Sequence, residues 1–148
     1  MKRVPIGLLA AVLLLRFHAV NAQDMSSYRK NAEATVKAKN PAWKLITRQS
    51  RDKEITYQWG QEKADVTLKV FNGASAKEAT DRMKRALDSL SVGPGEAISR
   101  FGDEAYLWKS EGNGFAGIRF RRGNVYIDIS GPSVAIVEDI AKDLAKLK

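Results

Sequence analysis

Residues 115–130 read FAGIRFRRGNVYIDIS, and this stretch decides the fold. Gly123-Asn124 is a two-residue turn signal between two runs that alternate apolar and polar side chains, the pattern of a tight antiparallel hairpin over 115–122 and 125–130. Neighbouring residues of a strand point to opposite faces, so one face is apolar and the other carries Arg, Tyr and Asp. The predicted cross-strand pairs are Arg121–Tyr126, Phe120–Ile127, Arg119–Asp128 and Ile118–Ile129.

The strand predicted at 104–109 continues this alternation. Ala105 and Leu107 are the apolar residues of this strand that we expect to join the core. Tyr106 and Trp108 then fall on the other face, which they share with the arginines of the hairpin.

Periodicity predicts three helices and further strands around this hairpin. Apolar residues recur at helical spacing in three segments, and Ser75 with Glu78 forms a capping box before the second of them. The remaining strands are short alternating runs. The predicted helices are 26–39, 76–90 and 134–147, and the other predicted strands are 43–49, 54–59, 64–71 and 98–101.

The runs 54–59 and 64–71 also form a predicted hairpin. If Trp59 pairs with Ala64, Tyr57 faces Val66 and one face of the hairpin becomes apolar. Strands in meanders with helices between them indicate an α+β fold with a mostly antiparallel sheet. The sequence predicts that this sheet carries an N-terminal, a middle and a C-terminal helix.

Residues 1–22 have the layout of a secretory signal peptide. Lys2 and Arg3 precede an apolar run over 6–15, and Ala22 ends a stretch of small residues that suits cleavage. The apolar run is about half of the roughly 20 residues that a membrane span needs. We therefore expect a single exported domain over 23–148, in the periplasm rather than outside the cell, with no transmembrane helix in the mature chain.

The composition excludes several kinds of chemistry. The chain has no cysteine, and its one histidine, His18, lies in the predicted signal peptide. A mature chain without either residue has no disulfide, thiol, His-ligated metal or His-activated nucleophile. We expect no catalytic residues, no metal and no cofactor. The net charge of +8 falls to +5 without residues 1–22, and most of what remains lies in 23–54.

One face of the strands in 104–130 gathers aromatic and charged side chains, and we name it the aromatic–arginine face. Its members are Tyr106, Trp108, Arg119, Arg121, Tyr126 and Asp128. Aromatic residues and arginines are enriched at binding hot spots, and guanidinium groups suit carboxylates and phosphates. The alternatives are structural. Arg119–Asp128 is then a cross-strand ion pair and Arg121 stacks on Tyr126, or the N-terminal helix covers the face.

A nucleic-acid partner is not expected. Residues 113–120 are similar to the RNP1 pattern of RNA-recognition domains. Asn113 stands where that pattern has a basic residue, and Gly117 stands where it has an aromatic ring. A glycine turn that enters a strand accounts for the similarity.

The carboxylates near the glycine-rich turn do not predict acid–base catalysis. Asp103 and Glu104 are adjacent in a strand and point to opposite faces. Catalytic carboxyl pairs face one substrate at roughly 5–9.5 Å. We expect Asp103 to cap the turn at Phe101-Gly102 instead.

Two segments resemble an element of small exported bacterial domains of uncharacterised function. The segments are Gly102-Asp103-Glu104-Ala105-Tyr106 and the run from Phe120 to Val125, and the resemblance covers about 102–147. The order of elements is also similar to that of Mog1/PsbP-like domains, a likeness of fold alone. Neither resemblance implies catalytic residues.

These observations predict a non-enzymatic exported module that binds a partner protein or a small anionic ligand through the aromatic–arginine face. The partner is not identified, and an envelope protein is one candidate. The first alternative is an accessory protein held at the envelope surface by basic residues of helix 26–39, namely Arg29, Lys30, Lys37 and Lys39. The second is a carboxylate-dependent enzyme.

Overall fold

The computed structural model describes residues 25–61, 64–89, 93 and 95–147. The predicted signal peptide and its cleavage site at Ala22 lie outside the described residues. The fold is α+β, with three helices and one seven-stranded antiparallel sheet of order β1-β2-β3-β7-β6-β5-β4. The helices are α1 (Met25–Lys39), α2 (Ala76–Asp88) and α3 (Val134–Leu144). The strands are β1 (Lys44–Ser50), β2 (Glu54–Gln61), β3 (Ala64–Asn72), β4 (Glu96–Ile98), β5 (Glu104–Lys109), β6 (Ala116–Arg122) and β7 (Val125–Gly131).

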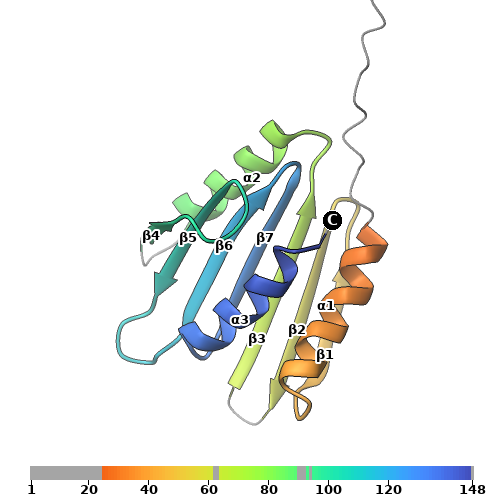
Figure 1. Cartoon of the computed structure of the whole chain (residues 1–148), viewed down its shortest axis with the longest axis vertical. Helices are drawn as coiled ribbons and strands as arrows, with labels where there is room; N and C mark the ends of the chain where they lie inside the picture. Colours follow the sequence, from red (N-terminus) through yellow and green to blue (C-terminus); the bar gives the residue numbers. More distant parts are fainter. Residues whose placement is uncertain (1–24, 62–63, 90–92, 94, 148) are drawn as a thin grey trace, which may run out of the picture.

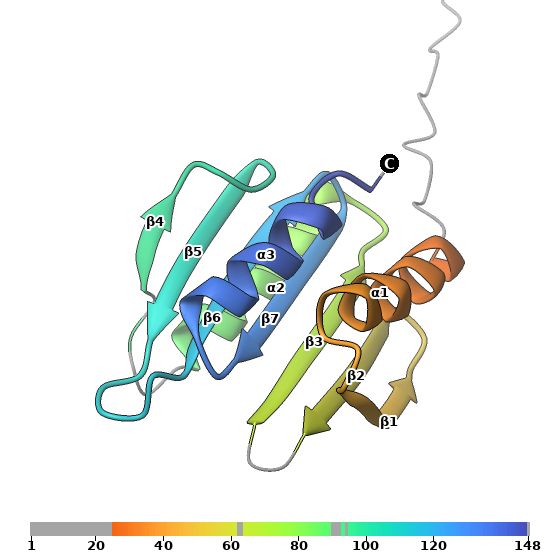
Figure 2. The same cartoon turned by 60° about the horizontal axis from the view of Figure 1, so that its bottom comes forward.

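The helices cover the two faces of the sheet unequally. Figure 1 shows α1 and α3 in front of the sheet and α2 behind it, and Figure 2 shows the same arrangement from a tilted view. The larger core lies on the side of α1 and α3, where alternate residues of the strands are buried against both helices. None of the described helices is long and apolar enough to cross a membrane.

A smaller core lies under α2. The apolar stripe of α2 is buried at Ala79, Met83, Ala86 and Leu87, and packs on Phe71 and Tyr126. Because α2 is amphipathic, it needs only one face of contact with the sheet. The prediction that α1 could cover the aromatic–arginine face is wrong: α1 lies on the opposite face, and α2 covers part of this one.

The hairpin of 115–130 has the predicted register. Arg121 pairs with Tyr126, Phe120 with Ile127, Arg119 with Asp128 and Ile118 with Ile129. The short turn leaves only one register that buries the apolar set. The predicted parity of β5 is also confirmed, because Tyr106 pairs with Arg119.

The register predicted for the first hairpin is wrong by two residues. Trp59 pairs with Val66 and Gln61 pairs with Ala64, because β2 continues to Gln61 instead of ending at residue 59. A shift of two residues keeps every side chain on its predicted face, since the period of a strand is two. Tyr57 and Leu68 therefore still face the core.

Element ends also differ from the prediction. The short strand lies at Glu96–Ile98 rather than 98–101, and Phe101 is buried in the turn that follows it. Helix α2 ends at Asp88, and helix α3 ends at Leu144. Residue 90, predicted as the last apolar position of α2, lies outside the described residues.

The N-terminus of α2 is held by one half of the predicted capping box, the Ser75 bond, whereas Glu78 bonds to the residue before the N-cap instead of to Ser75 itself. The hydroxyl of Ser75 accepts from the Glu78 N–H at 3.2 Å, and the Glu78 carboxylate accepts from the Ala74 N–H. Lys53 also donates to Glu78 at 2.8 Å. The bonds from Lys53 and from the Ala74 backbone lower the pKa of Glu78 below its ordinary value.

We expect Glu78→Gln to destabilise the protein near neutral pH and to have little effect in acid. A carboxyl with a lowered folded pKa stabilises the fold above its unfolded pKa, and this stabilisation is lost as the pH falls through the folded pKa. Urea midpoints of both proteins, measured at about pH 7 and about pH 3, check this. A difference that persists unchanged at the lower pH contradicts it.

We expect Leu144→Ala to lower the free energy of unfolding by about 2–5 kcal/mol, because it opens a cavity in the larger core. Leu144 is fully buried between α3 and the sheet. Lys142→Ala on the exposed side of the same helix is the control, with an expected change within about 0.5 kcal/mol. Urea unfolding measures both, and equal effects would contradict the assignment of α3 to the core.

Candidate functional site

Helix α2 covers one part of the aromatic–arginine face and leaves the other part open to solvent. Arg119, Tyr126 and Asp128 are buried, with 6%, 1% and 9% of their surface exposed. The other members, Tyr106, Trp108 and Arg121, are half-buried. All six lie on one side of the sheet as predicted, but only part of the face reaches solvent.

Arg119 joins the sheet to α2. Its Nε donates to Oδ2 of Asp128 at 3.1 Å, and its Nη1 donates to the carbonyl of Ala86 in the last turn of α2 at 3.0 Å. The hydroxyl of Tyr126 donates to the same Asp128 oxygen at 3.2 Å. The predicted cross-strand ion pair is therefore present, and its arginine also donates to a backbone carbonyl at the helix end, which accepts from the Ser89 hydroxyl as well.

Tyr126 has a raised pKa, mainly because it is buried and secondly because Asp128 lies beside it. The cation over its ring is Arg82 of α2, with the guanidinium carbon 5.7 Å from the ring centre. Arg82 also holds Glu54 at 2.7 Å. These contacts attach α2 to the sheet.

Arg121 belongs to a clasp between two turns. Its Nη1 donates to Asp103 at 2.9 Å and to the carbonyl of Gly123 at 2.9 Å. Asp103 also accepts from the Gly123 N–H at 2.8 Å. The prediction that Asp103 caps its own turn is therefore corrected, because its carboxylate caps the hairpin turn across the sheet.

The clasp joins the two segments on which the resemblance rests. Gly102 has a φ of +61°, and a Cβ at this position would strike the carbonyl of Arg121. The Asp103 N–H donates to that same carbonyl at 2.7 Å. Residues of the first segment thus contact residues of the second, and these contacts serve the fold.

Two hollows lie on the part of this sheet face that α2 leaves open. The first has a volume of about 210 Å³ and the second about 230 Å³. Lys69 of β3 lines both. The first hollow is lined by Thr67, Lys69, Trp108, Arg119, Asp128 and Ser130, and we name it the Lys69–Trp108 hollow. The second is lined by Gln49, Arg51, Glu54, Thr56 and Lys69.

Lys69 has no ion-pair partner among the described residues. Its cross-strand neighbour on β7 is Asp128, but the Asp128 carboxylate already accepts from Arg119 and Tyr126. The buried pair therefore leaves the Lys69 ammonium uncompensated at the edge of the hollow.

Trp108 supplies a second unpaired donor. Its ring lies against Gly117, where a Cβ would strike the indole. The indole Nε1 is buried and has no hydrogen-bond partner in the described part of the chain. A buried donor without an acceptor is costly, and an acceptor from outside reaches this one only if the indole shifts, because the atom has almost no contact with solvent.

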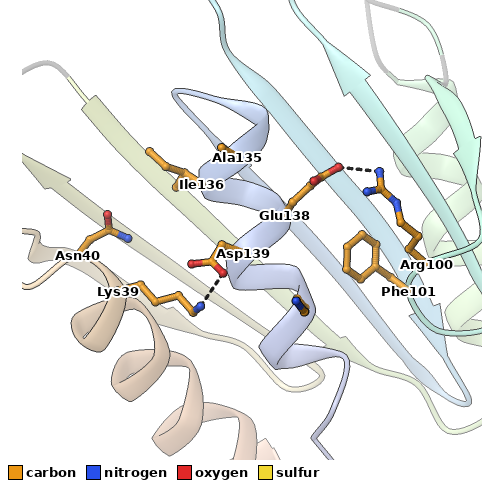
Figure 3. Close-up of a pocket in the computed structure, with 9 residues that line it drawn as sticks. Lys39, Asn40, Arg100, Phe101, Ala135, Ile136, Glu138 and Asp139 are labelled. Carbon is orange, nitrogen blue, oxygen red and sulfur yellow. Dashed lines mark hydrogen bonds and ion pairs between the residues drawn. The ribbon is translucent and has the colours of Figure 1, made fainter.

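A larger hollow lies on the other side of the sheet, over the outer surface of α3, and has a volume of about 720 Å³. Figure 3 shows that its charged side chains face one another: Lys39 reaches Asp139, and Arg100 reaches Glu138. These distances are 2.6 Å and 2.7 Å. Size favours this hollow, but two of its three lining cations, Lys39 and Arg100, already pair with its acids. Lys142 is the lining cation that has no ion pair among the described residues.

The predicted basic surface of α1 is smaller than the sequence indicates. Lys39 is engaged by Asp139 and Asp143 of α3, and its pKa is raised mainly by the hydrogen bond to Asp139. Lys30 and Lys37 are exposed. The side chain of Arg29 lies outside the described part of the structure.

The sequence prediction missed Thr67, Lys69 and Ser130 as members of a common hollow. Their strands are adjacent only because β3 pairs with β7, which joins the two meanders. The alternation within β3 did mark Lys69 as outward-facing. The missing information was which strand would lie beside it.

The described residues contain no group of three or more side chains placed to hold a metal ion. Comparisons with protein-family models, curated proteins and solved structures find no match for the chain. The two resemblances noted from the sequence therefore stay predictions.

We expect Arg119→Met to lower the free energy of unfolding by about 3–5 kcal/mol, because it leaves the buried Asp128 carboxylate without its cation. The double variant Arg119→Met/Asp128→Leu should lose less than this single variant. Arg100→Met removes an exposed ion pair and is the control, with an expected loss within about 1 kcal/mol. Urea unfolding measures all three, and a double variant worse than the single one would contradict a buried ion pair.

Proposed function

We propose that the protein is an exported, non-enzymatic binding module that holds an anionic group in the Lys69–Trp108 hollow. The observation that carries the proposal is the uncompensated ammonium of Lys69 beside an engaged Asp128. The hydroxyls of Thr67 and Ser130 line the same hollow. Its open groups are thus mainly donors, which suit a ligand rich in acceptor oxygens.

The size of the hollow limits the ligand. Sites for drug-sized ligands are about 300–1,000 Å³, whereas this hollow holds about 210 Å³. It fits a single carboxylate or phosphate group, presented by a small molecule or by an acidic side chain of a partner. Arg51 lies in the adjoining hollow and adds a second cation near Lys69.

Export is part of the proposal and rests on residues 1–22 alone. The layout of this segment supports a signal peptide. The chain has no cysteine, so its fold does not depend on a disulfide and holds no thiol that an oxidising compartment would alter.

We expect citrate and inorganic phosphate to shift the indole N–H resonance of Trp108 and the amide resonances near Lys69 in an NMR titration. Lys69→Met should weaken this binding by about tenfold or more, because it removes a charge-assisted contact. Lys109→Met removes an exposed cation at the end of β5 and is the matched control. Added salt should weaken binding to the parent protein.

Two results would count against this proposal. If Lys69→Met and Lys109→Met weaken binding equally, the anions respond to net charge and not to the hollow. If the shifts gather at Arg100 and Lys142, the larger hollow over α3 is the site. Trp108→Phe removes the indole N–H and keeps an aromatic ring. We expect this variant to lose less affinity for the anions than Lys69→Met.

A further inference from the structure

The edge strand β1 is open to solvent along its length. It stands at one end of the sheet, and all of its residues except Thr47 are exposed. The other edge strand, β4, is only three residues long. Short edge strands are protected against further pairing, whereas a longer open edge is a template for another strand.

The apolar side chains exposed in the described residues gather on this strand. Leu45 and Ile46 have 44% and 57% of their surface exposed, and no other large hydrophobic residue in the described part of the chain is as exposed. The register of β1 against β2 is irregular between Leu45 and Thr47. This bulge separates the apolar pair from the regular run that follows, and bulges commonly re-aim side chains at sheet edges.

The regular run directs backbone groups outward. Arg51 and Glu54 exchange both backbone hydrogen bonds, at 2.8 Å and 3.4 Å. Hydrogen-bonded and non-hydrogen-bonded pairs alternate along an antiparallel ladder. Counting back along the register, Gln49 bonds to β2 and Arg48 turns its N–H and C=O toward the open edge. An added strand would meet these groups.

The charge of this edge has one sign. Lys44, Arg48 and Arg51 lie in residues 44–51, and no acidic residue lies among them. Arg48 has an exposed ion pair with Glu33 of α1 at 3.3 Å. Exposed pairs contribute little, so an incoming carboxylate can replace Glu33 at small cost. A second copy of β1 would instead bring cations to cations, which disfavours self-pairing.

We propose that β1 is a docking strand for an extended acidic segment of a partner protein, which adds an eighth strand to the sheet. Backbone bonds to the edge give affinity, and side chains at alternate positions give selectivity. Leu45 and Arg48 pair with the core residues Trp59 and Tyr57 and lie on the α1 face, and Lys44 and Ile46 lie by Gly60 on the other face. The segment would therefore present an acid and an apolar residue on each of its faces, because neighbouring residues of a strand point to opposite faces. The proposal does not depend on the Lys69–Trp108 hollow.

The test uses fluorescein-labelled synthetic peptides as long as β1, and fluorescence anisotropy as the readout. The first peptide alternates pairs of Glu with pairs of Val, so that each face of the added strand carries both acids and apolar residues. The second has Lys in place of each acid, and the third is the acidic peptide with alternate backbone nitrogens methylated. We expect the full chain to bind the first peptide only, and the amide of Arg48 to become protected from hydrogen exchange in that complex.

Protein variants locate the contact. Arg48→Glu should weaken binding of the acidic peptide by about tenfold or more, since it sets like charges opposite each other. Lys84→Glu makes the same charge change on an exposed position of α2 and should leave binding unchanged. Lys69→Met should also leave peptide binding unchanged. A failure of the docking strand can therefore be told from a failure of the anion site in the Lys69–Trp108 hollow. Circular dichroism confirms that each variant is folded.

Three outcomes would overturn the proposal. Equal binding of the methylated peptide means that charge alone attracts it and that no strand is added. An unchanged affinity of Arg48→Glu places the contact elsewhere. Concentration-dependent dimerisation in size-exclusion chromatography, abolished by Ile46→Asp, assigns the edge to a second copy of the chain.

Discussion

The buried pair of Arg119 and Asp128 is the constraint on which the α2 side of the molecule depends. Two charges on neighbouring central strands have left water, and each must be satisfied inside the protein. The Asp128 carboxylate accepts from Arg119 and Tyr126, and Arg119 reaches the end of α2 through the Ala86 carbonyl. The position of α2 over the sheet is thereby coupled to the register of β6 and β7.

The position of α2 decides what the rest of that face can do. One helix of this length covers Phe71 and Tyr126 at one end of the strands and leaves the other end open. The open end holds Lys69, whose natural cross-strand partner is already taken. The Arg119–Asp128 contact stabilises the fold and thus leaves the Lys69 ammonium available to a ligand. The proposed function follows from this unpaired cation.

Much of the aromatic–arginine face proved to be part of the fold. Arg119, Tyr126 and Asp128 attach a helix, and Arg121 joins two turns through Asp103. Aromatic and cationic residues serve buried networks as well as they serve binding surfaces, so composition alone does not separate the two uses. Solvent access separates the two uses: Tyr106, Trp108 and Arg121 are half-buried, and of these Trp108 lines a hollow together with Lys69, which lies outside the six-residue face.

The sequence by itself determined the features that depend on neighbouring residues. The Gly123-Asn124 turn set the register of β6 and β7, Ser75 and Glu78 began α2, and period-two alternation assigned Tyr106 and Trp108 to one face. Only the tertiary structure decided that β3 lies beside β7, that α1 packs opposite the aromatic–arginine face, and that Lys69 lacks a partner among the described residues. The physical reason is range: turns and alternation act over a few residues, whereas the pairing of β3 with β7 joins residues about sixty positions apart, where the burial of the whole core selects the neighbour.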